Sequence, residues 1–269
     1  IIFSDILLVP HALGQEVSFT KNHGPILSTF DIKTFLDNSD INFSKILSPI
    51  YEAIKKTRKN LSKEKSLICF VGAPWTLLIY MLGIKKNKNE INFSNFKKIN
   101  LDMNLIINKL SDYLCLHIEN QINSGADTVQ IFDSWAGLIP QKNLKDFCYN
   151  PNLRIVEFCR KKNIPVICFP KGIKQKYLEF NNIVKPDGLN LDYDIRPDWA
   201  KKNLVDVVLQ GGLHPLTLLK SDNDMYGETK KYLDTFREVP YIFNLGHGIV
   251  PETSPDKVEK LINFVREYK

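Results

Sequence analysis

Short runs of β-branched and aromatic residues alternate along this chain with longer stretches of helical periodicity, and this alternation limits the possible folds most. Seven runs are predicted strands: residues 1–8, 66–72, 128–133, 165–169, 188–191, 205–210 and 241–245. Between them, apolar residues recur three and four positions apart, as Ile106, Leu110, Leu114 and Ile118 do in a predicted helix over 105–123. Strands that alternate with helices are typical of a parallel sheet, so we expect an α/β fold.

Two Ser-Pro pairs mark further helix starts. Ser is a common N-cap, and Pro suits the first helical turn, where its missing N–H is not needed. Ser48-Pro49 and Ser254-Pro255 therefore predict helices over 49–61 and 255–268. The Lys- and Asn-rich stretch 85–100 is predicted to be a long surface loop.

Two architectures share the alternating pattern, an open doubly wound sheet and a closed (β/α)₈ TIM barrel. No G-x-G-x-x-G motif or phosphate loop follows the first predicted strand, which disfavours the nucleotide-binding open sheet. Seven units are what a barrel missing its first βα unit would show, and 269 residues suit one barrel domain. We expect a single barrel domain over 1–269 with its N-terminal part absent, and low stability from unpaired edge strands.

The composition excludes several classes of partner. The net charge of +6 comes mainly from Lys, and no basic stripe with interleaved aromatic residues is present, so we expect no nucleic-acid partner. No apolar run is long enough to span a bilayer, so we expect no membrane partner.

The cysteines indicate a reducing compartment. Their number is odd, they form no C-x-x-C pair, and two of them lie inside predicted apolar strands; they are Cys69, Cys115, Cys148, Cys159 and Cys168. This pattern predicts free, mostly buried thiols and a cytoplasmic protein.

Four polar residues are candidates for the active site, because catalytic groups in (β/α)₈ barrels collect at the carboxyl ends of strands. Asp5 lies inside an apolar segment, and Tyr80 follows a predicted strand and tight turn. Ser134 follows the predicted strand 128–133, and His247 lies between two glycines.

Each candidate also has a purely structural interpretation. Asp5 could cap a strand end, Tyr80 could be a core residue with a bonded hydroxyl, and Ser134 could cap the next helix. For His247 the flanking glycines favour function, because they let the backbone approach a ligand closely.

The combination of motifs is more specific than any single residue. Several segments resemble the uroporphyrinogen decarboxylase family, in the family's order and over essentially the whole chain. They are Phe3-Ser4-Asp5-Ile6-Leu7, Gly72-Ala73-Pro74-Trp75-Thr76, Ile131-Phe132-Asp133-Ser134, Leu209-Gln210-Gly211 and Phe243-Asn244-Leu245-Gly246-His247-Gly248.

This resemblance implies a homodimeric (β/α)₈ barrel that converts uroporphyrinogen III to coproporphyrinogen III in tetrapyrrole synthesis. The reaction removes four acetate carboxyls without cofactor or metal. The resemblance puts the family's catalytic, pyrrole-binding aspartate at Asp5 and its substrate-binding tyrosine, serine and histidine at Tyr80, Ser134 and His247. The family's N-terminal arginine loop has no counterpart in these residues.

Two rival functions stay open at this point. A zinc-dependent corrinoid methyltransferase of the same superfamily needs closely spaced His and Cys ligands, but Cys115 and His117 lie in the middle of a predicted helix without a second Cys partner. A non-catalytic tetrapyrrole-binding protein would accommodate the absence of the arginine loop.

Overall fold

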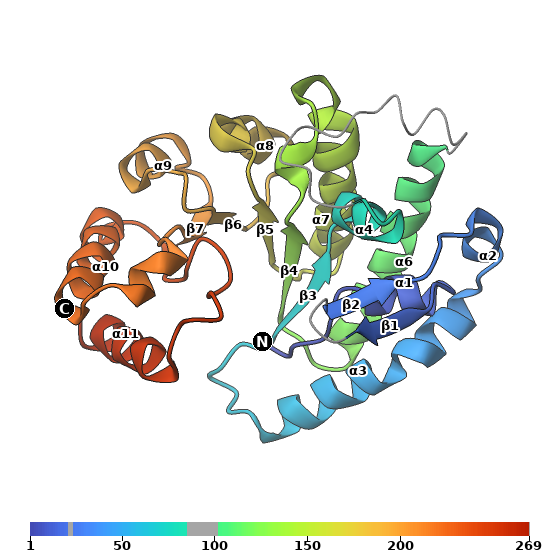
Figure 1. Cartoon of the computed structure of the whole chain (residues 1–269), viewed down its shortest axis with the longest axis horizontal. Coiled ribbons are helices and arrows are strands. Elements are labelled where there is room, and N and C mark those ends of the chain that lie inside the picture. Colours follow the sequence, from blue (N-terminus) through green and yellow to red (C-terminus); the bar gives the residue numbers. More distant parts are fainter. Residues whose placement is uncertain (21–23, 85–101, 269) are drawn as a thin grey trace. The chain divides into compact units, whose positions relative to one another are not determined.

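The computed structural model describes residues 1–20, 24–84 and 102–268, which form two compact units, Ile1–Pro170 and Lys171–Lys269. The predicted loop 85–100 lies outside the described residues. Parallel strands followed by helices recur in both units (Figure 1). The predicted α/β fold with parallel strands is confirmed, and closure into a barrel lacking one βα unit stays a prediction.

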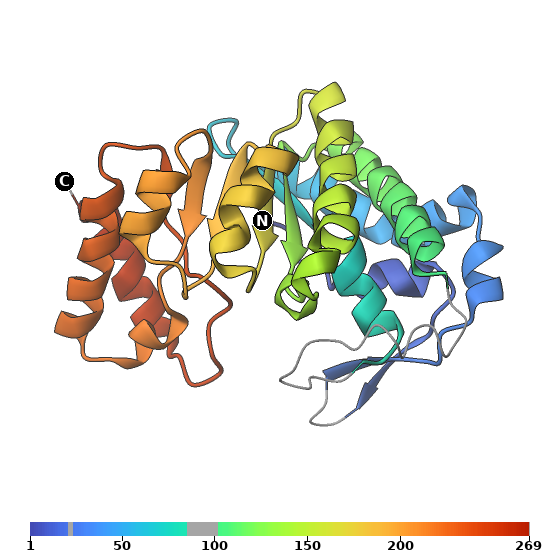
Figure 2. The ribbon, with the colours of Figure 1, turned by 90° about the horizontal axis from the view of Figure 1, so that it is seen from above.

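The first unit is built around three parallel strands, β3 (Ile68–Gly72), β4 (Thr128–Asp133) and β5 (Val166–Pro170). Its longer helices are α3 (Asp40–Asn60), α4 (Pro74–Met81), α6 (Met103–Asn123) and α7 (Asn150–Lys161). Helix α6 packs against both α3 and α7, and Figure 2 shows α6 and α7 side by side. Every residue of β5 is buried, as expected for a parallel strand covered on both faces.

The same unit contains smaller elements. An antiparallel hairpin joins β1 (Val17–Thr20) to β2 (Gly24–Leu27), and two short helices, α1 (Leu8–Ala12) and α2 (Ile32–Leu36), flank it. The hairpin was not among the predicted strands, because each of its strands has only four residues and none of their described side chains is buried.

The second unit repeats the arrangement with β6 (Gly188–Leu191), β7 (Val208–Gly211) and β8 (Tyr241–Ile242), again parallel. Its helices are α8 (Tyr177–Val184), α9 (Pro197–Asn203), α10 (Asp222–Phe236) and α11 (Pro255–Glu267). Helices α10 and α11 pack together over a small apolar core formed by Leu213, Leu218, Met225 and Leu261. None of the helices in the described parts of the chain is long and apolar enough to cross a membrane.

The predicted strand over residues 1–8 is wrong. Residues 1–5 have no regular structure, a turn follows, and Leu8 begins α1. Asp5 causes the turn, because its Oδ1 accepts a hydrogen bond from Leu7 N at 2.8 Å and so bends the chain out of an extended path. A backbone hydrogen bond from Ile2 N to Ile68 O, 3.4 Å long, joins the segment to β3.

The predicted helix over 49–61 begins nine residues too late, since α3 starts at Asp40 with Ser39 as its N-cap. Pro49 lies inside this helix, and the Ser48 hydroxyl donates to Lys45 O at 2.8 Å instead of capping. The helix continues through Pro49 because one buried stripe runs along its whole length, with Phe43, Leu47, Ile50 and Ile54. The other predicted strands and helices agree with the structure within a few residues at each end.

Candidate active site

The Asp5 turn lies beside the carboxyl end of β3. Asp5 is half-buried, and its main-chain oxygen accepts from Leu8 N at 3.1 Å while Oδ1 accepts from Leu7 N. The next side chain, Ile6, packs onto Gly72, where an added Cβ would lie 3.2 Å from the Ile6 Cδ1 atom. The carboxylate is therefore held beside the end of β3 by its own turn, and its place in the active site stays a prediction.

A row of aromatic rings runs from the Asp5 segment across the three strands of this unit. Neighbouring ring centroids lie 6.0 Å apart for Phe3 and Phe70, 5.6 Å for Phe70 and Phe132, and 6.2 Å for Phe132 and Phe169. Phe3 is 81% exposed, so the row ends in an open apolar surface two residues from Asp5. Such a surface suits a flat, apolar ring system.

Tyr80 and Ser134 flank one tryptophan in the first unit. Tyr80, in the last turn of α4, is 38% exposed, and its ring lies 6.0 Å from the Trp135 ring in an edge-on arrangement. Ser134 is half-buried directly after β4. The following 3₁₀ turn, η1 (Ala136–Leu138), begins after Trp135 and has no side-chain cap, so the structure does not support the capping role considered for Ser134.

A buried carboxylate that sequence analysis missed lies next to Ser134. Asp133 is 1% exposed and accepts from Thr76 Oγ1 at 2.7 Å and from Asn152 Nδ2 at 3.3 Å. Burial raises the pKa of Asp133 to about 6, against the hydrogen bonds that lower it. The signal in the sequence was an aspartate at the end of a predicted buried strand, where a carboxylate without a partner would be costly.

His247 belongs to the second unit, and its side chain is exposed. The glycine before it is needed for close backbone packing, since a Cβ on Gly246 would lie 2.5 Å from Tyr193 N. Gly246 N donates to Leu213 O at 2.8 Å, which ties the His247 loop to the segment after β7. Gly246 is therefore needed for packing against the chain's own backbone, and the approach to a ligand inferred from the glycines stays a prediction.

Two further residues at strand ends of this unit were missed. The rings of Tyr193, after β6, and His214, after β7, have centroids 4.3 Å apart, and Lys171 Nζ lies 6.0 Å from the Tyr193 ring centre. His214 Nδ1 accepts from Leu216 N at 3.1 Å, so a neutral His214 carries its proton on Nε2. His214, like His247, comes shortly after glycine at the end of a strand, and this pattern in the sequence could have identified it as a candidate.

A second buried carboxylate, Asp192, organises the loop after β6. Its oxygens accept from Gly172 N at 2.7 Å and from Asp194 N at 3.0 Å, and burial raises its pKa. These backbone donors hold Asp192 within its own unit, and we assign it a structural role.

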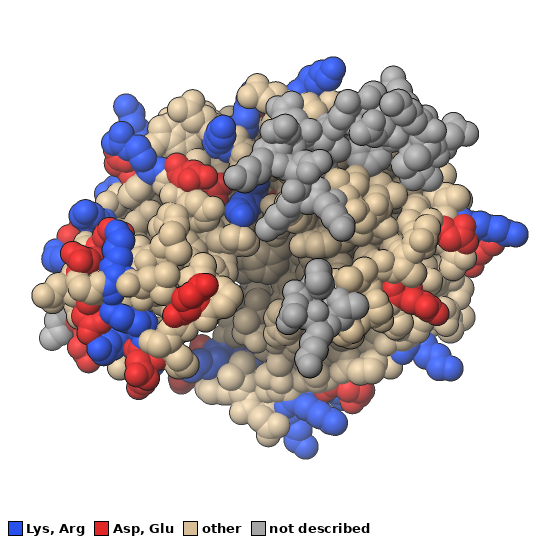
Figure 3. All heavy atoms as spheres, in the orientation of Figure 1, with Lys and Arg blue, Asp and Glu red and all other residues tan. Residues whose placement is uncertain are grey.

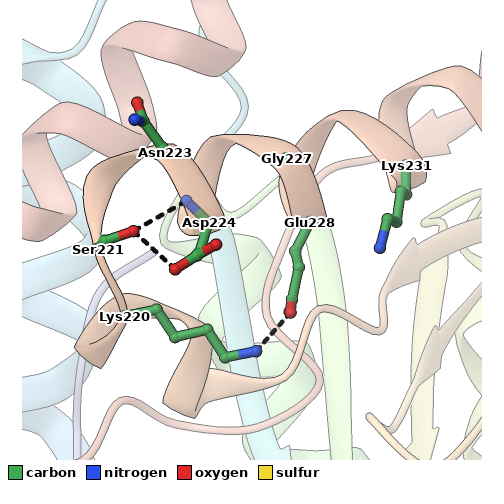
Figure 4. A pocket seen from close by; sticks show the side chains of 7 residues that line it. All are labelled: Lys220, Ser221, Asn223, Asp224, Gly227, Glu228 and Lys231. Atoms are coloured by element: carbon green, nitrogen blue, oxygen red, sulfur yellow. Dashed lines mark hydrogen bonds and ion pairs between the residues drawn. The ribbon is translucent and has the colours of Figure 1, made fainter.

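A surface pocket of about 600 Å³ at the start of α10 is a weaker candidate (Figure 4). Its charged groups bond to one another, since Lys220 pairs with Glu228 and the Ser221 hydroxyl caps Asp224 N at 3.2 Å. On the face seen in Figure 3, basic and acidic side chains are intermixed over α10 and α11, and no patch of one sign forms there.

The zinc-site alternative finds no support in this part of the chain. Across residues 1–20, 24–84 and 102–268, no three His, Cys, Asp or Glu side chains are grouped as metal ligands. His117 is buried and its Nδ1 lies 3.0 Å from the Tyr51 hydroxyl, while burial lowers the pKa of His117 to about 3. His117 is therefore a neutral core residue.

Comparison with known proteins identifies the family of this chain. The family model described as uroporphyrinogen decarboxylase (URO-D) matches residues 1–268. Proteins named uroporphyrinogen decarboxylase from Rickettsia bellii and Orientia tsutsugamushi (strain Boryong) are each 40% identical to the chain; both matches cover all of it, with 80% and 79% of the relatives.

Solved structures show the same fold at low identity. A methyltransferase from Methanosarcina mazei has a TM-score of 0.76 and 18% identity, over 99% of this chain and 79% of that one. A B12-independent methionine synthase from Shewanella has a TM-score of 0.59 and 9% identity, over 94% and 72%. The match of the family model over the chain, together with relatives at 40% identity, shows that this chain belongs to the uroporphyrinogen decarboxylase family.

Proposed function

We propose that this chain is a uroporphyrinogen decarboxylase, a carboxy-lyase of heme and tetrapyrrole biosynthesis. It would convert uroporphyrinogen III to coproporphyrinogen III by removing the carboxyls of four acetate side chains. Membership of the family supports this function. The observation that carries it is the Asp5 carboxylate, held at a strand end beside a row of aromatic rings that ends in the exposed ring of Phe3.

The substrate can supply its own electron sink. Protonation of a pyrrole carbon gives a cationic ring, and the electron pair of the breaking C–C bond moves into that ring as CO₂ leaves. A proton then adds to the former acetate carbon to leave a methyl group, while the ring loses its proton. The reaction proposed here therefore needs no group such as pyridoxal phosphate to accept electrons.

We assign to Asp5 the binding of the pyrrole N–H groups and the stabilisation of the developing positive charge. Opposite unit charges about 4 Å apart at an effective dielectric constant near 20 attract by roughly 4 kcal/mol. If the attraction acts mainly in the transition state, it is worth on the order of a thousandfold in rate. Phe3, the exposed ring of the aromatic row, would contact the macrocycle.

The other three candidates are assigned to the carboxylate side chains of the substrate. Tyr80 and Ser134 can each donate a hydroxyl hydrogen bond to a carboxylate oxygen. His247, when protonated, can add a positive charge. Each assignment is tested by a single substitution, Tyr80→Phe, Ser134→Ala or His247→Gln, which we expect to raise KM for uroporphyrinogen III.

The decisive experiment is anaerobic incubation of the protein with uroporphyrinogen III, followed by oxidation and chromatography of the porphyrins. We would compare the chain with a version that carries the N-terminal segment of the Rickettsia bellii relative ahead of Ile1. Coproporphyrin III from either version supports the proposal, and we expect Asp5→Asn to lower turnover on the order of a thousandfold in the active one.

Asp256→Asn, a change of an exposed carboxylate on α11, serves as the control and should turn over normally. Uroporphyrin binding by both versions without release of CO₂ would overturn the proposal in favour of a non-catalytic tetrapyrrole-binding protein. Full turnover by Asp5→Asn would overturn the role of Asp5.

We further propose a cytoplasmic homodimer. Large apolar side chains exposed on the described surface, such as Ile41 at 84%, Phe19 at 79% and Val205 at 71%, are candidates for burial by a second copy. Free cysteines suit a reducing compartment. Light scattering should give a mass near twice the 31.0 kDa of the chain, and the mass of one chain would contradict the dimer.

A further inference from the structure

We propose that Asp133 is a positioning residue that acts through Thr76 and Trp135 to hold Ser134 and Tyr80 in place for substrate binding. This inference rests on the proposed function, because it takes Ser134 and Tyr80 as the groups that contact substrate. Asp133 and Thr76 themselves are too deeply buried, at 1% and 0% exposure, to contact a ligand.

Three elements meet at the Asp133 carboxylate. Asp133 is the last residue of β4, Thr76 is in the first turn of α4, and Asn152 is in the first turn of α7. The carboxylate accepts from Thr76 Oγ1 at 2.7 Å through Oδ1, and from Asn152 Nδ2 at 3.3 Å through Oδ2. The ends of β4, α4 and α7 are thereby joined at one buried point.

The Thr76 hydroxyl links the Asp133 carboxylate to the loop after β4 through hydrogen bonds. Its proton is directed to Asp133, which leaves an oxygen lone pair that accepts from Trp135 N at 3.2 Å. Asp133 thus fixes the orientation of the Thr76 hydroxyl, and that orientation supplies the acceptor for Trp135 N. A valine at position 76 would have nearly the same shape and would lose both bonds.

Trp135 is held through both of its backbone groups by neighbouring residues of α4. Its N–H donates to Thr76, and its carbonyl oxygen accepts from Trp75 Nε1 at 3.0 Å. Ser134 lies between Asp133, whose side chain is bonded on both oxygens, and Trp135, whose backbone is bonded on both sides. The backbone of Ser134 therefore has little freedom to move.

The same helix face carries Tyr80. Thr76 and Tyr80 are four residues apart on α4 and so lie on one side of it. The Tyr80 ring contacts Trp135 with centroids 6.0 Å apart. One buried carboxylate consequently holds the loop that carries Ser134 against the helix that carries Tyr80.

The test compares Thr76→Val with Thr76→Ser. Thr76→Val keeps the packing and removes the hydroxyl, whereas Thr76→Ser keeps the hydroxyl. We expect Thr76→Val to raise KM for uroporphyrinogen III about tenfold with kcat changed less than about threefold, because binding is lost equally in the ground and transition states. Thr76→Ser should stay within about twofold of the wild type in KM.

Thr229→Val is the matched control. Thr229 is also fully buried, and its hydroxyl has no hydrogen-bond partner in the described residues. Its substitution should leave KM unchanged. A Thr76→Val protein with wild-type KM, or a Thr76→Ser protein as impaired as Thr76→Val, would overturn the proposal.

A double-mutant cycle separates positioning from stability alone. Because Asp133 is proposed to act through Ser134 and Tyr80, the second change in the cycle is Ser134→Ala together with Tyr80→Phe. Adding Asp133→Asn should then lower kcat/KM hardly further than this pair of changes alone. Fully additive losses would mean that Asp133 acts independently of both residues and would overturn the proposal. If neither Thr76→Val nor Asp133→Asn folds, the network serves stability and the proposal is wrong.

Measuring the affinity for uroporphyrin III allows the positioning role to be tested even if the proposed decarboxylase function fails. If the wild type binds uroporphyrin III without decarboxylating it, the proposed function fails, and the same cycle is measured on the Kd for uroporphyrin III. A Kd raised about tenfold in Thr76→Val and unchanged in Thr229→Val would still support positioning. Equal Kd values in both variants and in the wild type would overturn it.

Discussion

Asp133 makes the stability of this protein depend on pH in a predictable direction. Burial raises its pKa from an ordinary 3.8 to about 6. Because the folded-state pKa is the higher one, folding favours the protonated form. That stabilising contribution is complete below about pH 4 and is lost as the pH rises through about 6. The loss amounts to roughly 3 kcal/mol of unfolding free energy.

Asp133→Asn cannot ionise, so we expect the wild type to lose roughly 3 kcal/mol relative to this variant between about pH 4 and pH 7. Urea unfolding of both proteins across this range measures the difference. The titratable neighbour is Cys148, in the π-helical turn η3 (Lys145–Tyr149), and it stays neutral because its pKa is raised well above 9.0. Parallel stability curves would contradict the prediction.

The two glycines around His247 differ in what they tolerate. A Cβ on Gly246 would lie 2.5 Å from Tyr193 N and 2.9 Å from the Asp192 carbonyl carbon, and neither backbone atom can move freely. We expect Gly246→Ala to destabilise the protein by about 1–3 kcal/mol. Gly248→Ala meets nothing within 4 Å and should change stability by less than about 0.5 kcal/mol. Denaturant unfolding compares them, and equal effects would refute the packing argument.

At the residue scale, sequence reasoning located candidates by their place after predicted strands and missed those that depend on distant partners. Ser134 and His247 follow strands and were found in this way. Thr76 and Asp133 are 57 positions apart, and their hydrogen bond becomes visible only when β4 lies beside α4. A pattern along the chain carries no information about such a pairing.

At the element scale, the strands with continuous apolar runs were the predictable ones. The bounds of β4 and β6 are those expected from the sequence, because both strands are largely buried and need no alternating pattern. The segment 1–8 has an equally apolar sequence and forms a turn and a helix, because the Asp5 side chain competes for the backbone N–H of Leu7. Local composition could not show that competition.

Helix α3 contains a proline, Pro49, that destabilises it. Pro49 is exposed in the middle of the helix and cannot donate to the carbonyl four residues earlier, that of Lys45. The Ser48 hydroxyl donates to this carbonyl instead, which reduces the free-energy cost of the missing backbone hydrogen bond. We expect Pro49→Ala to stabilise the protein by about 1–2 kcal/mol, less than the roughly 3 kcal/mol of an uncompensated proline.

Thermal or urea unfolding of Pro49→Ala beside Ser48→Ala tests this account of α3. Ser48→Ala alone should destabilise, by about 0.5–1.5 kcal/mol, because it leaves the Lys45 carbonyl without its side-chain donor. A loss of stability in Pro49→Ala would show that the proline favours the helix as it stands.

At the scale of the whole molecule, both units place their candidate residues in the same way. Ser134 follows β4 in the first unit, and His214 and His247 follow β7 and β8 in the second. Parallel strands all end at one edge of their sheet, so each unit gathers polar groups where its strands finish. The ion pairs lie elsewhere, on the surface, where they contribute little to stability.

The reactivity of the thiols measures the packing of the first unit, Ile1–Pro170, which contains all five cysteines. Four of the five cysteines are buried, and Cys115 on α6 is half-buried. Burial raises the pKa of Cys69 to about 12 and that of Cys115 to about 11, from an ordinary 9.0. At pH 8 about one Cys115 thiol in a thousand is then ionised, and reaction needs the thiolate.

We therefore expect Ellman's reagent at pH 8 to modify native protein slowly, at Cys115 first and roughly a hundredfold more slowly than a free thiol. All five thiols should react at once in guanidinium chloride, and Cys115→Ser should remove the native reaction without changing the thermal midpoint. Fast modification of two or more thiols in the native protein would mean that the first unit opens in solution and exposes its core, because burial protects the other four.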